Sequence, residues 1–357
     1  MDSTASIPRA DSLLPSCPRT HCLEEAVEAM RDRFISPEDV ASLVVVLSRN
    51  VIAAAPPNQH GSFQDDTPGL EGFLWSLWYR LIVIADDDPS MHDRLGYILA
   101  AIMVKGKDGR EGWRIWGNDF DWANLPIFWP ALRECMNGLL IFLFKFIPDL
   151  LTVTLASAGP SVVDDNGKHL YQPYPSDVEV ALSGDPPTDS ARSRRAAQER
   201  TAWLNRNAFV ARLWVLGVAD MAFYGISTMR MELEPYSLSL DRRTLSESYG
   251  TKELDIENSA TYIRIAGKQM YECRDILGPK GNPGWPSNAG APGSSGGAWD
   301  GVDGYHPERW ALWKAILKDI SQREGRKNMI EAAKAAVVAM EKVEHEHGPI
   351  EHHAPSQ

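Results

Sequence analysis

The chain has 357 residues and a formal net charge of −12, with 44% hydrophobic and 24% charged residues, which are ordinary proportions for a globular protein with a sizeable core. The acidic balance argues against a nucleic-acid partner, because phosphate binding needs a basic face. Four cysteines without the spacing of a disulfide framework or a zinc site favour reduced thiols. With no signal-peptide pattern at the start, the sequence predicts an intracellular protein, cytoplasmic or nuclear.

The N-terminal half predicts a disordered start, residues 1–20, followed by a succession of helices. Ser36 is expected to cap the second of these helices and Pro37 to begin it. The Gly-containing stretch 105–119 is expected to be a loop. Helices are expected over residues 23–35, 37–55, 70–85, 91–102 and 124–136.

Residues 138–159 form the most apolar stretch of the chain and approach the length of a membrane span. Lys145, Pro148 and Asp149 lie at its centre, where charge is costly in hydrocarbon and proline breaks helical hydrogen bonding. Two short buried pieces around the proline are favoured, so no membrane span is expected.

The C-terminal half is organised around a long apolar pattern at residues 203–234. Apolar residues recur there at steps of four and three, and others lie outside that stripe, which predicts a central helix of about 30 residues buried on two sides. Flexible connections are expected at 160–195 and 279–304. Further helices are expected over 256–278, ending at Gly278-Pro279, and over 310–320 and 329–343.

These elements predict an all-α fold, a single irregular multi-helix domain over residues 21–347. Stacked helices would surround the long central helix and carry long exposed loops. The last residues, 348–357, are expected to be a disordered tail.

The three aspartates Asp86, Asp87 and Asp88 form the sharpest candidate metal cluster, because acidic groups at a helix end can hold Mg²⁺ and a diphosphate. They run consecutively into a proline and no second metal-binding motif follows, so a solvated helix end is favoured. The chain carries no nucleotide-binding loop, nucleophile elbow or zinc-protease motif. We therefore predict no cofactor, no metal site and no catalytic residue.

Charged residues on the central apolar stretch are the remaining candidates for a site, because buried charges are costly unless paired. Arg230 and Glu234 are four apart and could pair directly, whereas Arg212 and Asp220 could share one partner. They would either lock neighbouring helices together by ion pairs or form the polar floor of a ligand pocket. The predicted binding residues are Arg212, Arg230 and Glu234.

Three segments carry a family resemblance: WLNRNAFVARLWVLG at 203–217, TMRMELE at 228–234 and NSATYIRIAGKQMYE at 258–272. With Trp122, Leu125-Pro126-x-Phe128 and the Trp310/Trp313 helix, they resemble a fungal family named only as domain of unknown function 3632. The resemblance covers most of residues 20–345, with departures at 138–159 and 279–304. It implies a fungal, intracellular, helical protein and brings no known activity.

The sequence is therefore consistent with two functions. The first is a non-catalytic interaction or scaffold protein that uses the outer faces of its helices toward an unknown protein partner. The second is a binder or enzyme of an apolar small molecule, with a pocket lined by Trp and Met and oriented by Arg212, Arg230 and Glu234. A concave pocket at those charges would favour the second function, and mutually paired charges in a solid core would favour the first.

Overall fold

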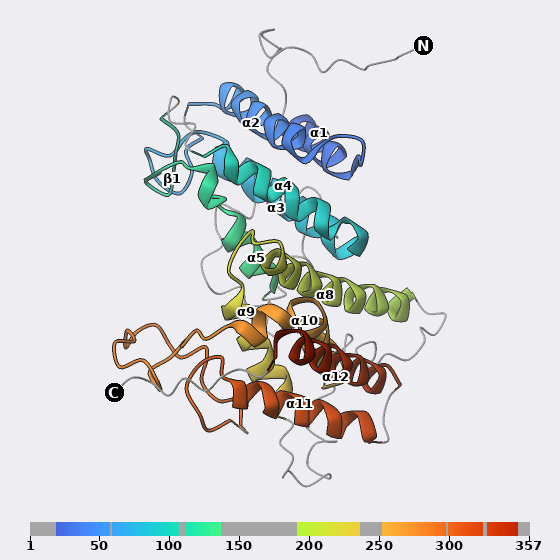
Figure 1. Cartoon of the computed structure of the whole chain (residues 1–357). Coiled ribbons are helices and arrows are strands. Elements are labelled where there is room, and N and C mark those ends of the chain that lie inside the picture. The colour runs from blue at the N-terminus through green and yellow to red at the C-terminus, as the bar shows by residue number, and fades with distance from the viewer. Residues whose placement is uncertain are drawn as a thin grey trace, which may run out of the picture. The chain divides into compact units, whose positions relative to one another are not determined.

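The computed structural model describes residues 19–57, 59–106, 112–136, 191–235, 252–297, 299–323 and 327–348. These residues form helices and one very short antiparallel hairpin, so the all-α prediction is confirmed (Figure 1). The chain divides into two compact units, the first including residues up to 81 and 98–135, the second including 82–97 and 191–348. The single domain expected over 21–347 stays a prediction.

The first unit contains two complete N-terminal helices that run side by side (Figure 1). Its elements are α1 (Arg19–Arg31), α2 (Pro37–Ala54), parts of α3 (Leu70–Asp87) and α4 (His92–Val104), β1 (Arg114–Ile115), β2 (Asn118–Asp119), η2 (Trp122–Asn124) and α5 (Phe128–Met136). Ser36 caps α2 by accepting a hydrogen bond from the backbone N–H of Asp39 at 3.1 Å, as the sequence predicts. The buried indole of Trp78 on α3 donates to the carbonyl of Pro126, 2.7 Å away.

The loop expected at 105–119 contains the hairpin, which sequence reasoning missed. Its two-residue turn, Trp116-Gly117, has positive φ at both residues, 54° and 70°, as a tight hairpin turn of this length requires. The Trp116 indole donates to the Glu71 carboxylate at 2.9 Å, which helps to hold this bulky residue in the left-handed region. Trp-Gly is not a usual signal for such a turn, for which Asn-Gly or Asp-Gly is typical, so the hairpin could not be predicted from these residues.

The second unit is built around α10, which packs against α8 and α12, while α11 packs against α12 (Figure 1). Its elements are η1 (Pro89–Met91), α8 (Ala191–Val215), α9 (Ala222–Thr228), the π-helix η4 (Met229–Leu233), α10 (Lys252–Glu272), α11 (Pro307–Gln322) and α12 (Lys327–His347). The last two helices match the predicted ones closely.

The predicted continuous helix over 203–234 is wrong, because the chain breaks after Val215. Gly217 adopts φ 67°, and the N–H groups of Gly217 and Val218 donate to the carbonyls of Trp214 and Leu213. This glycine-dependent pair of bonds is a common way to end a helix. Asp220 then accepts from the N–H of Ala222 at 2.9 Å at the start of α9. The apolar spacing continues across the break, which is why periodicity alone did not reveal it.

The end predicted for the next helix is also wrong, because α10 stops at Glu272 rather than at Gly278-Pro279. The following residues instead pair with the end of the Gly-rich segment. Leu277 N–H donates to the Asp303 carbonyl at 2.6 Å, and Tyr305 N–H donates to the Asp275 carbonyl at 3.0 Å. These bonds tie the two ends of the 279–304 segment together.

The predictions for residues 1–18, 138–159, 160–190 and 349–357 lie outside the described residues. The disordered start expected to residue 20 and the flexible connection expected to residue 195 are wrong at their ends, because residues 19–20 belong to α1 and residues 191–195 to α8. No helix in the described part of the chain is long and apolar enough to cross a membrane.

Candidate functional site

Glu234, a predicted site residue, ends the π-helix η4 with its side chain fully buried. Its Oε1 accepts hydrogen bonds from Arg309 Nε at 2.7 Å and from the Trp313 indole at 2.9 Å. Its Oε2 accepts from the backbone N–H of Gly296 at 2.7 Å. Both oxygens of the carboxylate therefore have partners supplied by the protein itself.

Arg309 on α11, the partner of Glu234, is also fully buried. Its Nη1 donates to the carbonyls of Gly293 and Gly304, at 2.5 and 3.0 Å, and its Nη2 donates to that of Ser294 at 2.9 Å. The guanidinium carbon lies 5.6 Å from the Trp299 ring centroid and 5.8 Å from that of Trp313, which adds cation–π attraction. We call this arrangement of Glu234, Arg309 and Trp313 the Glu234 centre.

Sequence reasoning missed Arg309, because a charged residue in the first turn of a helix usually faces solvent. One signal was available: Arg309 lies four residues before Trp313, and a helix places such residues on the same face. A buried tryptophan face therefore indicated that this arginine enters the core.

Backbone groups of the Gly-rich segment 279–304 bond to the Glu234 centre. The N–H of Gly296 donates to Glu234, and the carbonyls of Gly293 and Ser294 accept from Arg309. An added Cβ at Gly296 would lie 1.8 Å from the Arg230 carbonyl oxygen, and one at Gly293 would lie 2.4 Å from that of Asp303. Glycine is needed at these positions because the backbones approach too closely for a side chain. The flexibility expected from composition remains a prediction, but the structure adds these anchors to it.

The predicted ion pair between Arg230 and Glu234 is not formed, because Arg309 occupies the carboxylate. Arg230 Nη1 instead donates to the carbonyl of Ala291 in the Gly-rich segment, 3.3 Å away. Arg212 and Asp220 do not share a partner in the described residues. Arg212 binds both oxygens of Asp93, while Asp220 contacts the start of α9.

The three predicted residues are therefore not joined into one polar floor by any hydrogen bond within the described part of the chain. Arg230 and Glu234 both contact the Gly-rich segment, through Ala291 and Gly296. Arg212 instead pairs with Asp93, and their side chains are 36% and 48% exposed, respectively.

The aspartate cluster is a solvated helix end only in part: Asp87 is exposed and Asp88 half-buried, but Asp86 is buried against Arg206 of α8. Arg206 Nε and Nη2 donate to the two carboxylate oxygens at 3.1 and 2.7 Å, and Asn205 donates to the Asp86 carbonyl at 2.7 Å. Asp88 caps η1 by accepting from the N–H of Ser90 at 2.9 Å. Among the described residues, no group of three His, Cys, Asp or Glu side chains is arranged to hold a metal ion.

A second polar group lies beside η4 and is less completely satisfied. We call it the Glu232 cluster, formed by Glu232, Asn258, Ser259 and Tyr262. Asn258 Nδ2 donates to both oxygens of Glu232, at 2.9 and 2.8 Å. Asn258 Oδ1 is buried without a hydrogen bond to any described residue. The buried hydroxyls of Ser259 and Tyr262 interact with Glu232 and Thr228, but neither forms a well-formed hydrogen bond to a described residue.

Burial dominates the electrostatics of the Glu232 cluster. It raises the pKa of Glu232 well above its ordinary value, and the neighbouring carboxylate of Asp255 raises it further. Burial likewise raises the pKa of Tyr262, to which the charge of Glu232 adds. A carboxyl group that holds its proton this strongly can act as a hydrogen-bond donor, which an ionised carboxylate cannot.

A comparison with protein-family models finds one match, to the family described as protein of unknown function (DUF3632), over residues 78–317. The chain belongs to the DUF3632 family. Neither the curated proteins nor the solved structures contain a match. The DUF3632 match includes the Glu234 centre, the Glu232 cluster and the Asp86–Arg206 pair, whereas α1, α2 and α12 lie outside it.

Proposed function

We propose that the chain is a non-catalytic protein-interaction module that presents the outer faces of its helices to a partner protein. The observation that carries this proposal is the internal pairing of the buried Glu234 centre. Glu234 is the most deeply buried of the three predicted site residues, and its carboxylate already accepts from Arg309, Trp313 and Gly296. A carboxylate that is fully buried and engaged in this way holds the fold together and is not exposed to a ligand.

Exposed apolar side chains on both units give this proposal candidate contact points. Single exposed apolar residues are normal in proteins, so they mark where to look rather than proving a surface. Those at least half exposed are Phe34, Phe63, Tyr97, Val104, Phe223, Met231 and Val338.

The second candidate function is small-molecule binding at the Glu232 cluster. It is favoured by the buried polar atoms of Asn258, Ser259 and Tyr262 that lack a well-formed partner, because such atoms normally bind water or a ligand. The chemistry of the cluster suits a polar group that both donates and accepts hydrogen bonds. This differs from the apolar ligand that the sequence predicts.

Native mass spectrometry of the protein purified from its source cells, before and after gentle unfolding, separates the two functions. The interaction function predicts a second polypeptide in the complex that is lost in Met231→Lys or Phe223→Ser and kept in Asn258→Ala. Small-molecule binding predicts an added mass of a few hundred daltons or less that leaves on unfolding and is lost in Asn258→Ala. That second pattern, without a bound polypeptide, would contradict the interaction proposal.

A further inference from the structure

Glu232 faces a row of polar side chains on α10. Four polar residues recur along this helix at steps of three and four, which places them on one face: Asp255, Asn258, Ser259 and Tyr262. The hydrogen bonds between Asn258 and Glu232 show that this face is turned toward η4. Asn258 and Ser259 are fully buried, whereas Glu232 is half-buried and stands in a π-helix, a rare form that is frequent at functional sites. The cluster therefore combines a partly accessible carboxylate with buried neutral oxygen atoms.

Within the described residues, the carboxylate of Glu232 forms no ion pair with a cation. The arginine of the neighbouring Glu234 centre is already paired, and Arg230 donates to the Ala291 carbonyl. The charge that acts on Glu232 from α10 is that of another carboxylate, Asp255. Because a carboxylate removed from water is costly without a positive partner, ionisation of Glu232 is favoured by a cation that reaches it.

Asn258 supplies a further oxygen atom beside this carboxylate. Its Nδ2 donates to both oxygens of Glu232, at 2.9 and 2.8 Å, while Oδ1 of the same amide is buried without a hydrogen bond to any described residue. The oxygen and nitrogen of an amide are about 2.2 Å apart, which places Oδ1 within about 5 Å of the carboxylate oxygens. One ion can bridge oxygens at such a separation. The Ser259 hydroxyl also interacts with Glu232, and a hydroxyl that donates a hydrogen bond keeps its acceptor lone pairs.

We propose that the Glu232 cluster binds one monovalent metal ion, Na⁺ or K⁺, through a carboxylate oxygen of Glu232, Oδ1 of Asn258 and the hydroxyl oxygen of Ser259. Hard cations bind oxygen ligands of these kinds rather than nitrogen or sulfur. The single coordinating carboxylate neutralises a single positive charge, and Asp255 adds attraction through its charge. Mg²⁺ and Ca²⁺ are disfavoured, because no three His, Cys, Asp or Glu groups converge among the described residues.

The ion and a proton compete for Glu232. In the ion-free protein, burial and the charge of Asp255 raise the pKa of this carboxyl and favour its protonated form. A bound cation favours the ionised form instead, so the ion should bind more weakly as the pH falls. The other titratable groups that act on the cluster are Asp255, Tyr262 and Tyr224. The cation of choline chloride is surrounded by methyl groups and cannot be coordinated by these oxygens, so this salt isolates the effect of the proton.

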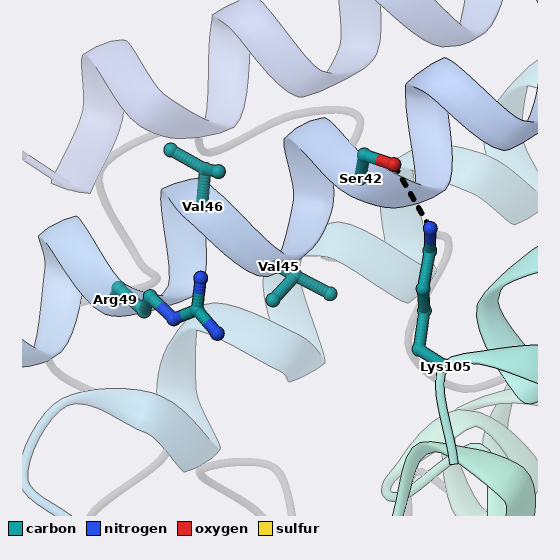
Figure 2. Close-up of a pocket in the computed structure, with 5 residues that line it drawn as sticks. All are labelled: Ser42, Val45, Val46, Arg49 and Lys105. Atoms are coloured by element: carbon teal, nitrogen blue, oxygen red, sulfur yellow. Dashed lines mark hydrogen bonds between the residues drawn. The ribbon is translucent and has the colours of Figure 1, made fainter. Parts of the chain in front are cut away.

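The shallow depression on α2 lacks these features. It measures about 310 Å³ and is lined by Ser42, Val45, Val46, Arg49 and Lys105 (Figure 2). Lys105 Nζ already donates to the Ser42 hydroxyl at 2.9 Å. Arg49 and Lys105 both carry positive charge, which repels a cation, so the Glu232 cluster is the stronger candidate for an ion site.

The ion site is independent of the interaction function, because a module that binds a partner protein can also hold a structural ion. It uses the site of the second candidate function and assigns a metal ion to it in place of an organic ligand, which would be detected by its added mass whichever salt is present. Failure of the ion proposal would leave the interaction function intact, because that function is tested by the bound polypeptide in the variants at Phe223 and Met231. The sequence predicts no metal site, since neutral ligands such as Asn and Ser form no recognisable motif.

The test is thermal unfolding of the full chain, followed by circular dichroism, in KCl, NaCl or choline chloride at about 0.2 M. Equal ionic strength in the three salts removes screening as an explanation. At pH 8 the Tm is expected to be about 2–4 °C higher in KCl or in NaCl than in choline chloride, because an ion that binds only the folded chain stabilises it. The difference is expected to shrink at pH 5, where a proton occupies Glu232.

Glu232→Gln removes the charge, keeps the shape and should abolish the difference between the salts. Ser259→Ala removes one ligand oxygen and should reduce the difference, which keeps the proposal testable if the first variant does not fold. Glu272→Gln makes the same change at a carboxylate of α10 that is paired with Lys268, so this matched control should keep the full difference. Equal Tm values in the three salts at pH 8 would overturn the proposal. So would a difference that persists in Glu232→Gln, or stabilisation by CaCl₂ without any by KCl or NaCl.

Discussion

Glu232 and Glu234 lie two residues apart at η4, but the groups around their carboxylates differ. Glu234 is buried and receives three hydrogen bonds, one from the charged guanidinium of Arg309. Glu232 receives the amide of Asn258 in a cluster where other buried polar atoms form no well-formed hydrogen bond to a described residue, and its pKa is raised. Glu234 is the more deeply buried of the two, yet it is Glu232 whose pKa is raised, so the partners supplied with a carboxylate matter beside its burial.

The largest expected effect comes from breaking the Glu234 centre. Arg309→Met should lower the free energy of unfolding by about 3–5 kcal/mol, because it leaves the buried Glu234 carboxylate without its counter-charge. Chemical denaturation monitored by circular dichroism measures this loss. The double variant Arg309→Met/Glu234→Gln should recover part of it, since the uncompensated charge is then gone.

Arg230→Ala is the matched control for that prediction, because it removes an arginine from the same region. Within the described residues Arg230 makes one hydrogen bond, of 3.3 Å to Ala291, so its loss should cost no more than about 1 kcal/mol. Equal losses for Arg230→Ala and Arg309→Met would mean that the centre is not held by the counter-charge of Arg309.

Most helices could be predicted from the spacing of apolar residues, whereas the hydrogen-bond partners of the charged side chains could not. The heptad-like patterns located α2, α3, α11 and α12, because each buries one face and the sequence records that face directly. The break at Gly217 was hidden, since the apolar pattern runs through it.

The pairing of charges was predicted least well. Arg309 with Glu234 and Arg206 with Asp86 join residues 75 and 120 positions apart in the chain. Local spacing rules cannot predict pairs between residues so far apart in the chain. The four-residue spacing of Arg230 and Glu234 predicted an ion pair between them, but in the folded chain each has a different partner. Of the four charges expected to be buried, only Glu234 is buried, whereas Arg212 and Arg230 are half-buried and Asp220 is exposed. The partner of Glu234 could not be predicted from the sequence either.

The second prediction concerns the Gly-rich segment that completes the Glu234 centre. Gly296→Ala should lower the free energy of unfolding by about 1–3 kcal/mol, because the new methyl group collides with the Arg230 carbonyl and displaces the donor to Glu234. Hydrogen exchange should also become faster at residues 293–297. In Gly284→Ala, where the nearest atom lies 3.5 Å away, stability should be unchanged or higher by up to about 1 kcal/mol.

The third prediction tests the other carboxylate. Because the folded chain holds the proton of Glu232 more tightly than the unfolded chain does, this stabilisation is present below the unfolded pKa and is lost as the pH rises through the folded pKa. Glu232→Gln should therefore gain stability relative to the native chain as the pH rises from 4 to 7. Denaturation at a series of pH values measures this difference, and a constant difference would show that Glu232 titrates normally.

The smallest expected effect belongs to His92, whose titration opposes that of Glu232. Its Nε2 lies 2.9 Å from the Ala85 carbonyl, which has no helical donor because Pro89, four residues later, lacks an N–H. Burial lowers the pKa of His92, more than the hydrogen bond with Ala85 and the charges of Asp93 and Asp88 raise it. The stabilisation is thus complete above the ordinary pKa of 6.5 and is lost as the pH falls from there toward the folded pKa. His92→Gln keeps a donor for Ala85 and cannot titrate, so its stability should fall less than that of the native chain between pH 7 and pH 5. Equal losses in the two proteins would assign the acid sensitivity of the fold to other groups and leave His92 as a neutral hydrogen-bond donor only.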